Sequence, residues 1–437
     1  MRKLTTMTVL LTVACCVSAM AELQNVEIGG SLRIRGNYFD MDSLGDYSFI
    51  EQRTRLNVKA DFTQQVSAFI EFDHYNFWGE DFRSWYLCGN DFRSGLNHVN
   101  LYQAYIDVQN LWGSPLSVRV GRQEFRLGAA FFIGTNESSA YFSGLSFDGI
   151  RLTYATEQFA INAVTAKPYE GYGNFLEDDA DLFGVYFSYM GIEDVALDAY
   201  WLYARDMVAL LGDRVDLHVL GLRGAGVVGG FDFEVEAAYQ FGDVDGIASA
   251  CPLGFGDADV GFDEFGANLE VGYTFDAAWQ PRLFARFAYL GGGDPDTSAW
   301  SNDADLPFVR LTSDIKYSEF LDNAPGSVFK ATLSNVLFYS LGIQVLPTES
   351  VELKLAGAYF DVDEEAYPGA SDKLGWEVGL YGDYHYSEDL AFRAGYAHFF
   401  GDRGLEGNAL IGSGMVPWLG NCDDDYDYMF IETELAF

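Results

Sequence analysis

Apolar and polar residues alternate strictly along the chain, in stretches of about ten residues. The stretch 31–38 reads Ser-Leu-Arg-Ile-Arg-Gly-Asn-Tyr, and the stretches 55–62, 231–237, 351–355 and 431–437 repeat the pattern. Because successive side chains of a β-strand point to opposite faces, each stretch predicts a strand with one apolar and one polar face. Downstream of the N-terminal segment, no apolar run approaches the roughly 20 residues of a membrane-spanning helix, which excludes a helix bundle.

The gaps between the predicted strands alternate between short and long. Residues 63–65 and 347–350 form tight turns, whereas 74–98 and 291–327 are long and rich in Gly and Asp. A soluble sandwich or lectin shares the residue alternation, but short turns at one end and long loops at the other are typical of an outer-membrane barrel. The predicted strands are 26–38, 48–62, 66–73, 99–109, 116–126, 145–154, 159–167, 182–190, 196–205, 216–225, 231–241, 264–275, 282–290, 328–345, 351–361, 374–386, 390–399 and 427–437.

The fold predicted from this rhythm is all-β: a transmembrane antiparallel β-barrel of about 18 strands (16 to 18), with short periplasmic turns and long outer loops. In hydrocarbon every backbone donor and acceptor must be paired, so the sheet must close on itself. An even strand number returns both termini to the periplasm. The C-terminal Phe437, after Leu435 and Thr433, resembles the terminal strand signal of outer-membrane barrels.

The N-terminus has the pattern of a signal peptide. Basic residues at 2–3 precede an apolar stretch at 4–17, and Ala-Met-Ala at 19–21 forms a small-x-small cleavage site. We therefore expect residues 1–21 to be a signal peptide and residues 22–437 to form the barrel, located in the bacterial outer membrane. A lipoprotein cleaved before one of two adjacent cysteines in this segment is the weaker alternative.

Charge and motifs exclude several other functions. The formal net charge of −39 would repel a phosphate backbone, so nucleic acid is not an expected partner. The five His residues show no ligand spacing and no Gly-x-Ser-x-Gly elbow occurs, so we expect no enzyme; an outer-membrane lipase that builds its site across strands is the alternative. The Gly-rich stretch 224–229 has the dinucleotide-binding spacing, but a strand follows it where the motif needs a helix.

The polar faces of the predicted strands supply candidates for a pore lining. If Leu32 and Ile34 face lipid, the basic residues between and beside them face the lumen, and the same parity applies to the other strands. One wall is then basic, and acidic residues at 232–236 and 270 make the facing wall acidic. The predicted pore-lining, substrate-binding residues are Arg33, Arg35, Arg53, Arg55, Lys59, Arg119, Arg151, Arg282, Arg286 and Arg393.

Two interpretations of these charges stay open. Planar guanidinium groups bind carboxylates or sugar hydroxyls bidentately, which suits an anionic solute. Alternatively, the charges pair with one another and only fill a polar lumen. Arg122 and Arg126 are left out of the set because Gly121 permits a β-bulge that would reverse their facing.

Three sequence blocks carry a family resemblance: Gln-Ala-Tyr at 103–105, Gly-Arg-Gln-Glu at 121–124 and Phe-Asp-Gly at 147–149. In this order they resemble the alginate-export family of outer-membrane porins, over about residues 30–155. The resemblance implies an eighteen-stranded monomeric barrel whose arginine-lined pore passes a polyuronate. The acidity of this chain and its Asp-rich loops depart from a plainly anion-conducting pattern.

The function predicted is passive transport by an outer-membrane porin, most specifically export of an alginate-like polyuronate or a sugar acid. The partners are then the lipid bilayer, the anionic polysaccharide or sugar acids, and periplasmic export proteins. The alternatives are a general diffusion porin, or a surface-binding barrel whose Asp-rich outer loops hold divalent ions; no cofactor is expected apart from Ca²⁺ in those loops. Cys88, Cys251 and Cys422 fall in the same loops and allow one disulfide.

Overall fold

The computed structural model describes residues 23–41, 45–79, 99–135, 144–170, 179–206, 214–245, 259–293, 303–322, 333–365, 371–403 and 425–437. The predicted signal peptide and all five cysteines lie outside these residues. The described strands are β1 (Asn25–Met41), β2 (Gly45–Asp61), β3 (Val66–Phe77), β4 (Asn100–Val108), β5 (Leu116–Gln123), β6 (Phe147–Ala155), β7 (Phe159–Tyr169), β8 (Ala180–Ile192), β9 (Val195–Arg205), β10 (Arg214–Val228), β11 (Phe231–Asp245), β12 (Asp259–Thr274), β13 (Arg282–Leu290), β14 (Asp303–Leu306), β15 (Val336–Thr348), β16 (Val351–Asp361), β17 (Lys373–His385), β18 (Leu390–Gly401) and β19 (Asp425–Ala436), with one 3-10 helix, η1 (Leu111–Gly113).

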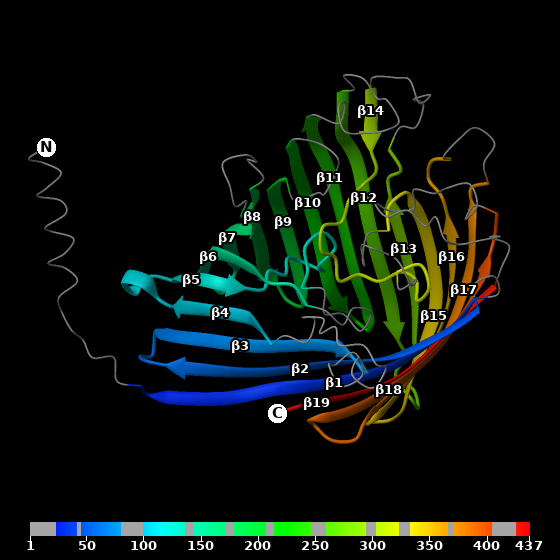
Figure 1. Cartoon of the computed structure of the whole chain (residues 1–437), viewed down its shortest axis with the longest axis horizontal. Helices are drawn as coiled ribbons and strands as arrows, with labels where there is room; N and C mark the ends of the chain where they lie inside the picture. The colour runs from blue at the N-terminus through cyan, green and yellow to red at the C-terminus, as the bar shows by residue number, and fades with distance from the viewer. Residues whose placement is uncertain are drawn as a thin grey trace, which may run out of the picture.

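The strands form a closed antiparallel barrel (Figure 1). Strand β1 pairs with β2 on one side and with the C-terminal strand β19 on the other, so the blue and red ends of the chain lie together. Strand β13 pairs directly with β15, which leaves β14 outside the ring and eighteen strands within it. The predicted barrel of about 18 strands is confirmed. Among the described residues, no helix is long and apolar enough to cross a membrane.

The alternation seen in the sequence separates two faces of the sheet. Apolar side chains on the outer face are strongly exposed; Leu56 is 46% exposed and Leu341 is 71% exposed. Their neighbours in sequence point inward, and Arg53 is only 5% exposed. Exposed apolar side chains all around a closed sheet suit lipid rather than water, and the polar inner face suits a water-filled lumen.

Most strand boundaries shift by a few residues, and three differences from the sequence prediction are larger or bear on the interior. Strand β14 was expected to be loop; it pairs in parallel with the first residues of β12. The predicted strand 116–126 ends at Gln123, because Gly121 (φ +129°) and Gly128 (φ +58°) take backbone conformations that turn the chain away from the sheet. The predicted strand 328–345 begins at Val336 within the described residues.

Two stretches of chain fold into the barrel instead of extending beyond it. We call residues 124–135 the first inner segment and residues 307–322 the second inner segment. They meet along a short parallel bridge: the Gly134 N–H donates to the Thr312 carbonyl at 2.7 Å, and the Thr312 N–H donates to the Phe132 carbonyl at 3.1 Å. The Asp314 N–H also donates to the Ala130 carbonyl at 3.0 Å. The joined segments therefore narrow the lumen from two sides.

Aromatic side chains attach the inner segments to the inner face of the sheet. Phe131 stacks on Phe308 with 5.6 Å between ring centroids, and both are fully buried. Phe320 stacks on Tyr426 of β19 at 4.2 Å. Each fully buried aromatic side chain contributes about 1.5–3 kcal/mol to stability. The barrel thus contains an apolar core of its own, formed by the inner segments and the part of the sheet beneath them.

Candidate functional site

A cavity of about 720 Å³ lies between the inner segments and the inner face of strands β12, β13 and β15 to β19. Its size falls within the roughly 300–1,000 Å³ of small-molecule sites. Charged groups dominate its lining, and neither sign prevails by more than one charge. The basic residues are Arg126, Arg286, Lys316, Lys354 and Arg393; the acidic residues are Glu270, Asp314, Glu319, Glu352, Glu377 and Asp383.

Three of the predicted pore-lining arginines meet at one carboxylate, Glu432 of β19. Barrel closure places Glu432 between Arg35 of β1 and Arg393 of β18 in register. Its oxygens lie 2.9 Å from Arg33 Nη2, 2.6 Å from Arg35 Nη2 and 2.7 Å from Arg393 Nη1. Glu432 is 1% exposed, so this carboxylate offsets the positive charge of three arginines from two strands.

A second group of predicted residues lies on β2 and also pairs with carboxylates. The Arg53 guanidinium donates to Asp73 of β3, with 2.9 Å between Nη2 and Oδ2. Arg55 lies 3.5 Å from Glu124 of the first inner segment, and both guanidinium groups lie over the ring of Tyr102, at 5.1 Å and 4.3 Å. Rings and carboxylates therefore hold the β2 arginines in place.

The remaining predicted residues of the N-terminal strands lie closer to the periplasmic turns. Arg119 pairs with Asp107 at 2.7 Å and lies 4.0 Å above the ring of Tyr105. Arg151 donates to the side-chain carbonyl of Asn162 at 2.9 Å. Lys59, with its side chain 44% exposed, lies 3.7 Å from Glu27 and 3.6 Å from Asp61.

Arg282 and Arg286 lie on β13, among the residues that were expected to form an acidic wall. Arg282 pairs with Asp232 and Glu270, at 2.8 Å from the latter, and Arg286 lies 3.5 Å from Glu270. The separation into one basic and one acidic wall is therefore wrong. Arg223 of β10, which the prediction omitted, strengthens the correction because it pairs with Asp198 and Glu234.

Two basic residues of the cavity, Lys316 and Lys354, were missed by the sequence analysis. Lys354 of β16 lines the cavity, and its Nζ lies 5.3 Å above the ring of Phe284 and 5.6 Å above the ring of Tyr381. Among the described residues, no carboxylate oxygen lies within 4.0 Å of this ammonium group. Lys354 occupies a polar position of the alternating stretch 351–355, so the parity argument could have found it.

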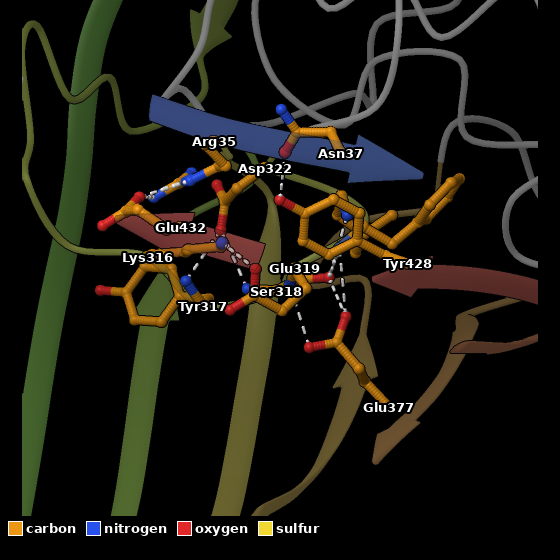
Figure 2. Close-up of polar contacts among 12 residues, drawn as sticks. Arg35, Asn37, Lys316, Tyr317, Ser318, Glu319, Asp322, Glu377, Tyr428 and Glu432 are labelled. Atoms are coloured by element: carbon orange, nitrogen blue, oxygen red, sulfur yellow. Dashed lines mark hydrogen bonds and ion pairs between the residues drawn. The ribbon is translucent and has the colours of Figure 1, made fainter. Parts of the chain in front are cut away.

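One buried carboxylate fastens the second inner segment to β17, and a second one, within the segment, braces its backbone (Figure 2). Glu377 of β17 accepts hydrogen bonds from the Ser318 hydroxyl at 2.5 Å and from the N–H groups of Glu319 and Phe320 at 3.0 Å and 3.3 Å. Asp322 accepts from the backbone N–H groups just before them. Burial raises the pKa of the Asp322 carboxyl above its ordinary value, since the ionised form loses hydration.

The facing of the two doubtful arginines differs. Arg122 shares the outward face with Val120 and pairs with Asp148 of β6 at 2.8 Å, both side chains being well exposed. Arg126 belongs to the first inner segment, lines the cavity and lies 3.8 Å from Asp314. The sequence blocks that carry the family resemblance therefore contribute to the outer surface as well as to the lumen.

Two further expectations concern turns and metal ions. The Gly-rich stretch 224–229 ends β10, and Gly229 and Gly230 make the turn into β11 with positive φ. Within the described ranges no group of three or more His, Cys, Asp or Glu residues is placed to hold a metal ion. The predicted acidic runs at 294–296 and most of 423–425 lie outside the described residues.

Comparison with families of known proteins matches residues 24–404 to the family described as Alginate export. No curated protein matches the chain. Solved structures from Pseudomonas aeruginosa share the fold: OpdL at 13% identity and TM-score 0.58, covering 94% of this chain and 99% of that one, and OccK8 (OprE) at 15% and 0.56, covering 94% and 98%. OccK2 (OpdF), solved in complex with glucuronate, matches at 14% and 0.55, covering 94% and 98%.

Proposed function

Since the chain belongs to the alginate-export family, we propose that this outer-membrane porin channel passes sugar acids, as single uronates or as uronate chains. The cavity beneath the inner segments carries the proposal, because it combines basic side chains with many carboxylates at the narrowed part of the lumen. Sugar acids present one or more carboxylates and several hydroxyl donors, which match the two kinds of lining group.

The rows of arginines on β1, β2 and β5 support passage of an anion along the wall. Each guanidinium group has five N–H donors, so one group can serve more than one acceptor. Ion pairing of Arg53 and Arg119 lowers the net field that such a solute experiences. We therefore expect moderate anion preference rather than the strong preference of an unpaired basic wall.

A general diffusion porin is the second candidate, and the near balance of charges in the cavity favours it. The two differ in their response to solute chemistry. A sugar-acid channel should be blocked by uronates at lower concentration than by neutral sugars of the same size, because only uronates engage the guanidinium groups. A general porin should treat the two alike.

Single-channel recording in planar bilayers tests the proposal. The purified full-length barrel should conduct and should be blocked by mono- and oligouronates more strongly than by the matching neutral sugars. Replacing Arg53, Arg119 and Arg151 together with Gln should shift the reversal potential toward cations and weaken uronate block. Equal block by charged and neutral sugars would reduce the function to general diffusion, and absence of conductance would refute a channel.

A further inference from the structure

We propose that Lys354 and the ring of Tyr381 form a binding site for one sugar-acid unit, with the carboxylate on Lys354 and the pyranose face on the ring. This inference rests on the proposed function. It names residues of β16 and β17, in the cavity beneath the inner segments, that would select the solute. None of them belongs to the arginine rows of β1, β2 and β5.

The first support is the state of the Lys354 ammonium. The lumen-facing arginines at positions 33, 35, 53, 119 and 393 each lie within 2.9 Å of a carboxylate oxygen. Lys354 has only ring faces at comparable contact, although Glu270, Glu319 and Glu352 attract it from farther away and Arg286 repels it. An ammonium group held in this way keeps its three donors for a ligand.

The second support is the way in which glycines let the rings lie flat on the wall. A Cβ added at Gly342 would lie 2.2 Å from Phe284 Cζ, and one at Gly379 would lie 2.2 Å from the Tyr381 hydroxyl oxygen. Each ring therefore occupies the space that a side chain at the adjacent glycine would fill. A ring lying along the wall presents its face to the lumen, whereas a ring standing upright would present its edge.

Phe430 of β19 extends this floor. A Cβ added at Gly395 would lie 2.3 Å from Phe430 Cε1 and 2.8 Å from Tyr381 Cδ1, so the two rings share the space over one glycine. Tyr381, Phe430 and Lys354 all line the cavity. The apolar face of a pyranose ring stacks on such an aromatic floor, as other flat apolar groups do.

The surrounding carboxylates complete the match to a sugar. Glu319, Glu352 and Asp383 line the same cavity and can accept hydrogen bonds from sugar hydroxyls. An inorganic anion has no hydroxyl donors for these acceptors and no apolar face to place on Tyr381. The combination of one cation, flat rings and several acceptors therefore selects a polyhydroxylated carboxylate.

Block of single-channel current by galacturonate and glucuronate oligomers, compared with neutral oligosaccharides, tests the site. The variant Lys354→Gln should weaken uronate block by roughly tenfold or more, the loss expected for one charged hydrogen bond, and leave neutral sugars unchanged. Lys354→Arg should retain most of the block. Lys373→Gln removes the same charge from an exposed position at the other end of β17 and should change nothing.

The ring is tested separately. Tyr381→Leu should weaken block by uronates and by neutral sugars alike, whereas Tyr381→Phe, which keeps the ring, should retain it. If the unmodified pore is blocked preferentially by uronates and Lys354→Gln leaves that block within twofold, the site is refuted while the sugar-acid channel stands. If the unmodified pore does not distinguish uronates from neutral sugars, both proposals fail. Unchanged gel mobility of the unheated variants verifies that the barrel has folded.

Discussion

The inner faces of β1 to β3 and of β8 to β10 belong to one sheet but differ in what they contact. On the first, buried polar groups pair with partners on neighbouring strands: Arg35 with Glu432, and Asp73 with Arg53. On the second, many inward residues are apolar, and Leu182 and Leu217 are completely buried within the apolar core that the inner segments complete, although Asp198 and Arg223 also pair on this face. The polarity of the inner-face residues thus indicates whether that part of the wall contacts water or the inner segments.

The comparison also predicts that substitutions affect the stability of the two regions differently. The polar wall depends on matched charges, so removal of one partner leaves a buried charge uncompensated. The covered wall depends on shape, so its stability is distributed over many apolar contacts. Three substitutions would break or sharpen this contrast.

The largest effect should follow from Glu432→Gln. Arg33, Arg35 and Arg393 would lose the carboxylate that they share, at a cost on the order of 3–5 kcal/mol. We expect the temperature at which the barrel loses its compact gel mobility to fall, and anion selectivity to rise. Glu434→Gln, at a more exposed carboxylate that pairs with Arg393 at 2.6 Å, is the matched control. Equal midpoints for the two variants would contradict the assignment.

A smaller effect should follow from Glu377→Leu. The Ser318 hydroxyl and the N–H groups of Glu319 and Phe320 would lose their acceptor; because the segment can then detach and let these donors reach water, we expect a total cost of about 1–3 kcal/mol. We expect the second inner segment to detach from β17, which raises single-channel conductance and current noise.

Glu352→Leu makes the same chemical change in the same cavity, away from the hydrogen bonds that fasten the second inner segment. It should leave the current noise at the level of the unmodified channel. A Glu377→Leu channel with unaltered conductance and noise would show that the inner segment is held without this carboxylate.

The smallest effect should follow from Arg122→Gln. Its pair with Asp148 is exposed on the outer face, and such pairs contribute about 0–1 kcal/mol. Conductance, selectivity and thermal midpoint should all stay close to those of the unmodified barrel. A clear change in ion selectivity would mean that Arg122 faces the lumen in the membrane.

The barrel was predictable from the sequence because outward alternation and gap length are local signals. The inner segments were not, since no local feature distinguishes a loop that turns inward from one that extends outward. Parts of β8 and β10 carry apolar residues on both the lipid face and the inner face, where the inner segments cover the wall. This feature is visible in the sequence, but an argument from alternation alone does not use it.

The candidate site was predicted in part. Parity identified residues on the inner strand faces, including Arg393, but the carboxylates that pair with them come from neighbouring strands. The contact between Arg35 and Glu432 joins residues 397 positions apart and depends on the register in which the barrel closes. Lys354 was not predicted because an isolated lysine carries no motif. Among the described residues, no carboxylate oxygen lies within 4.0 Å of its ammonium group, and only the three-dimensional structure reveals this.

The pairing of β19 with β1 also has a consequence for assembly. Until the last strand docks, Arg33 and Arg35 on one edge and Arg393 on the other have no Glu432 to bind. These ion pairs can form only in the correct register of β19 against β1. A slip of one residue would turn Glu432 toward lipid and leave the arginines without this carboxylate. The ion pairs to Glu432 therefore stabilise the correct register at the step in which the barrel closes.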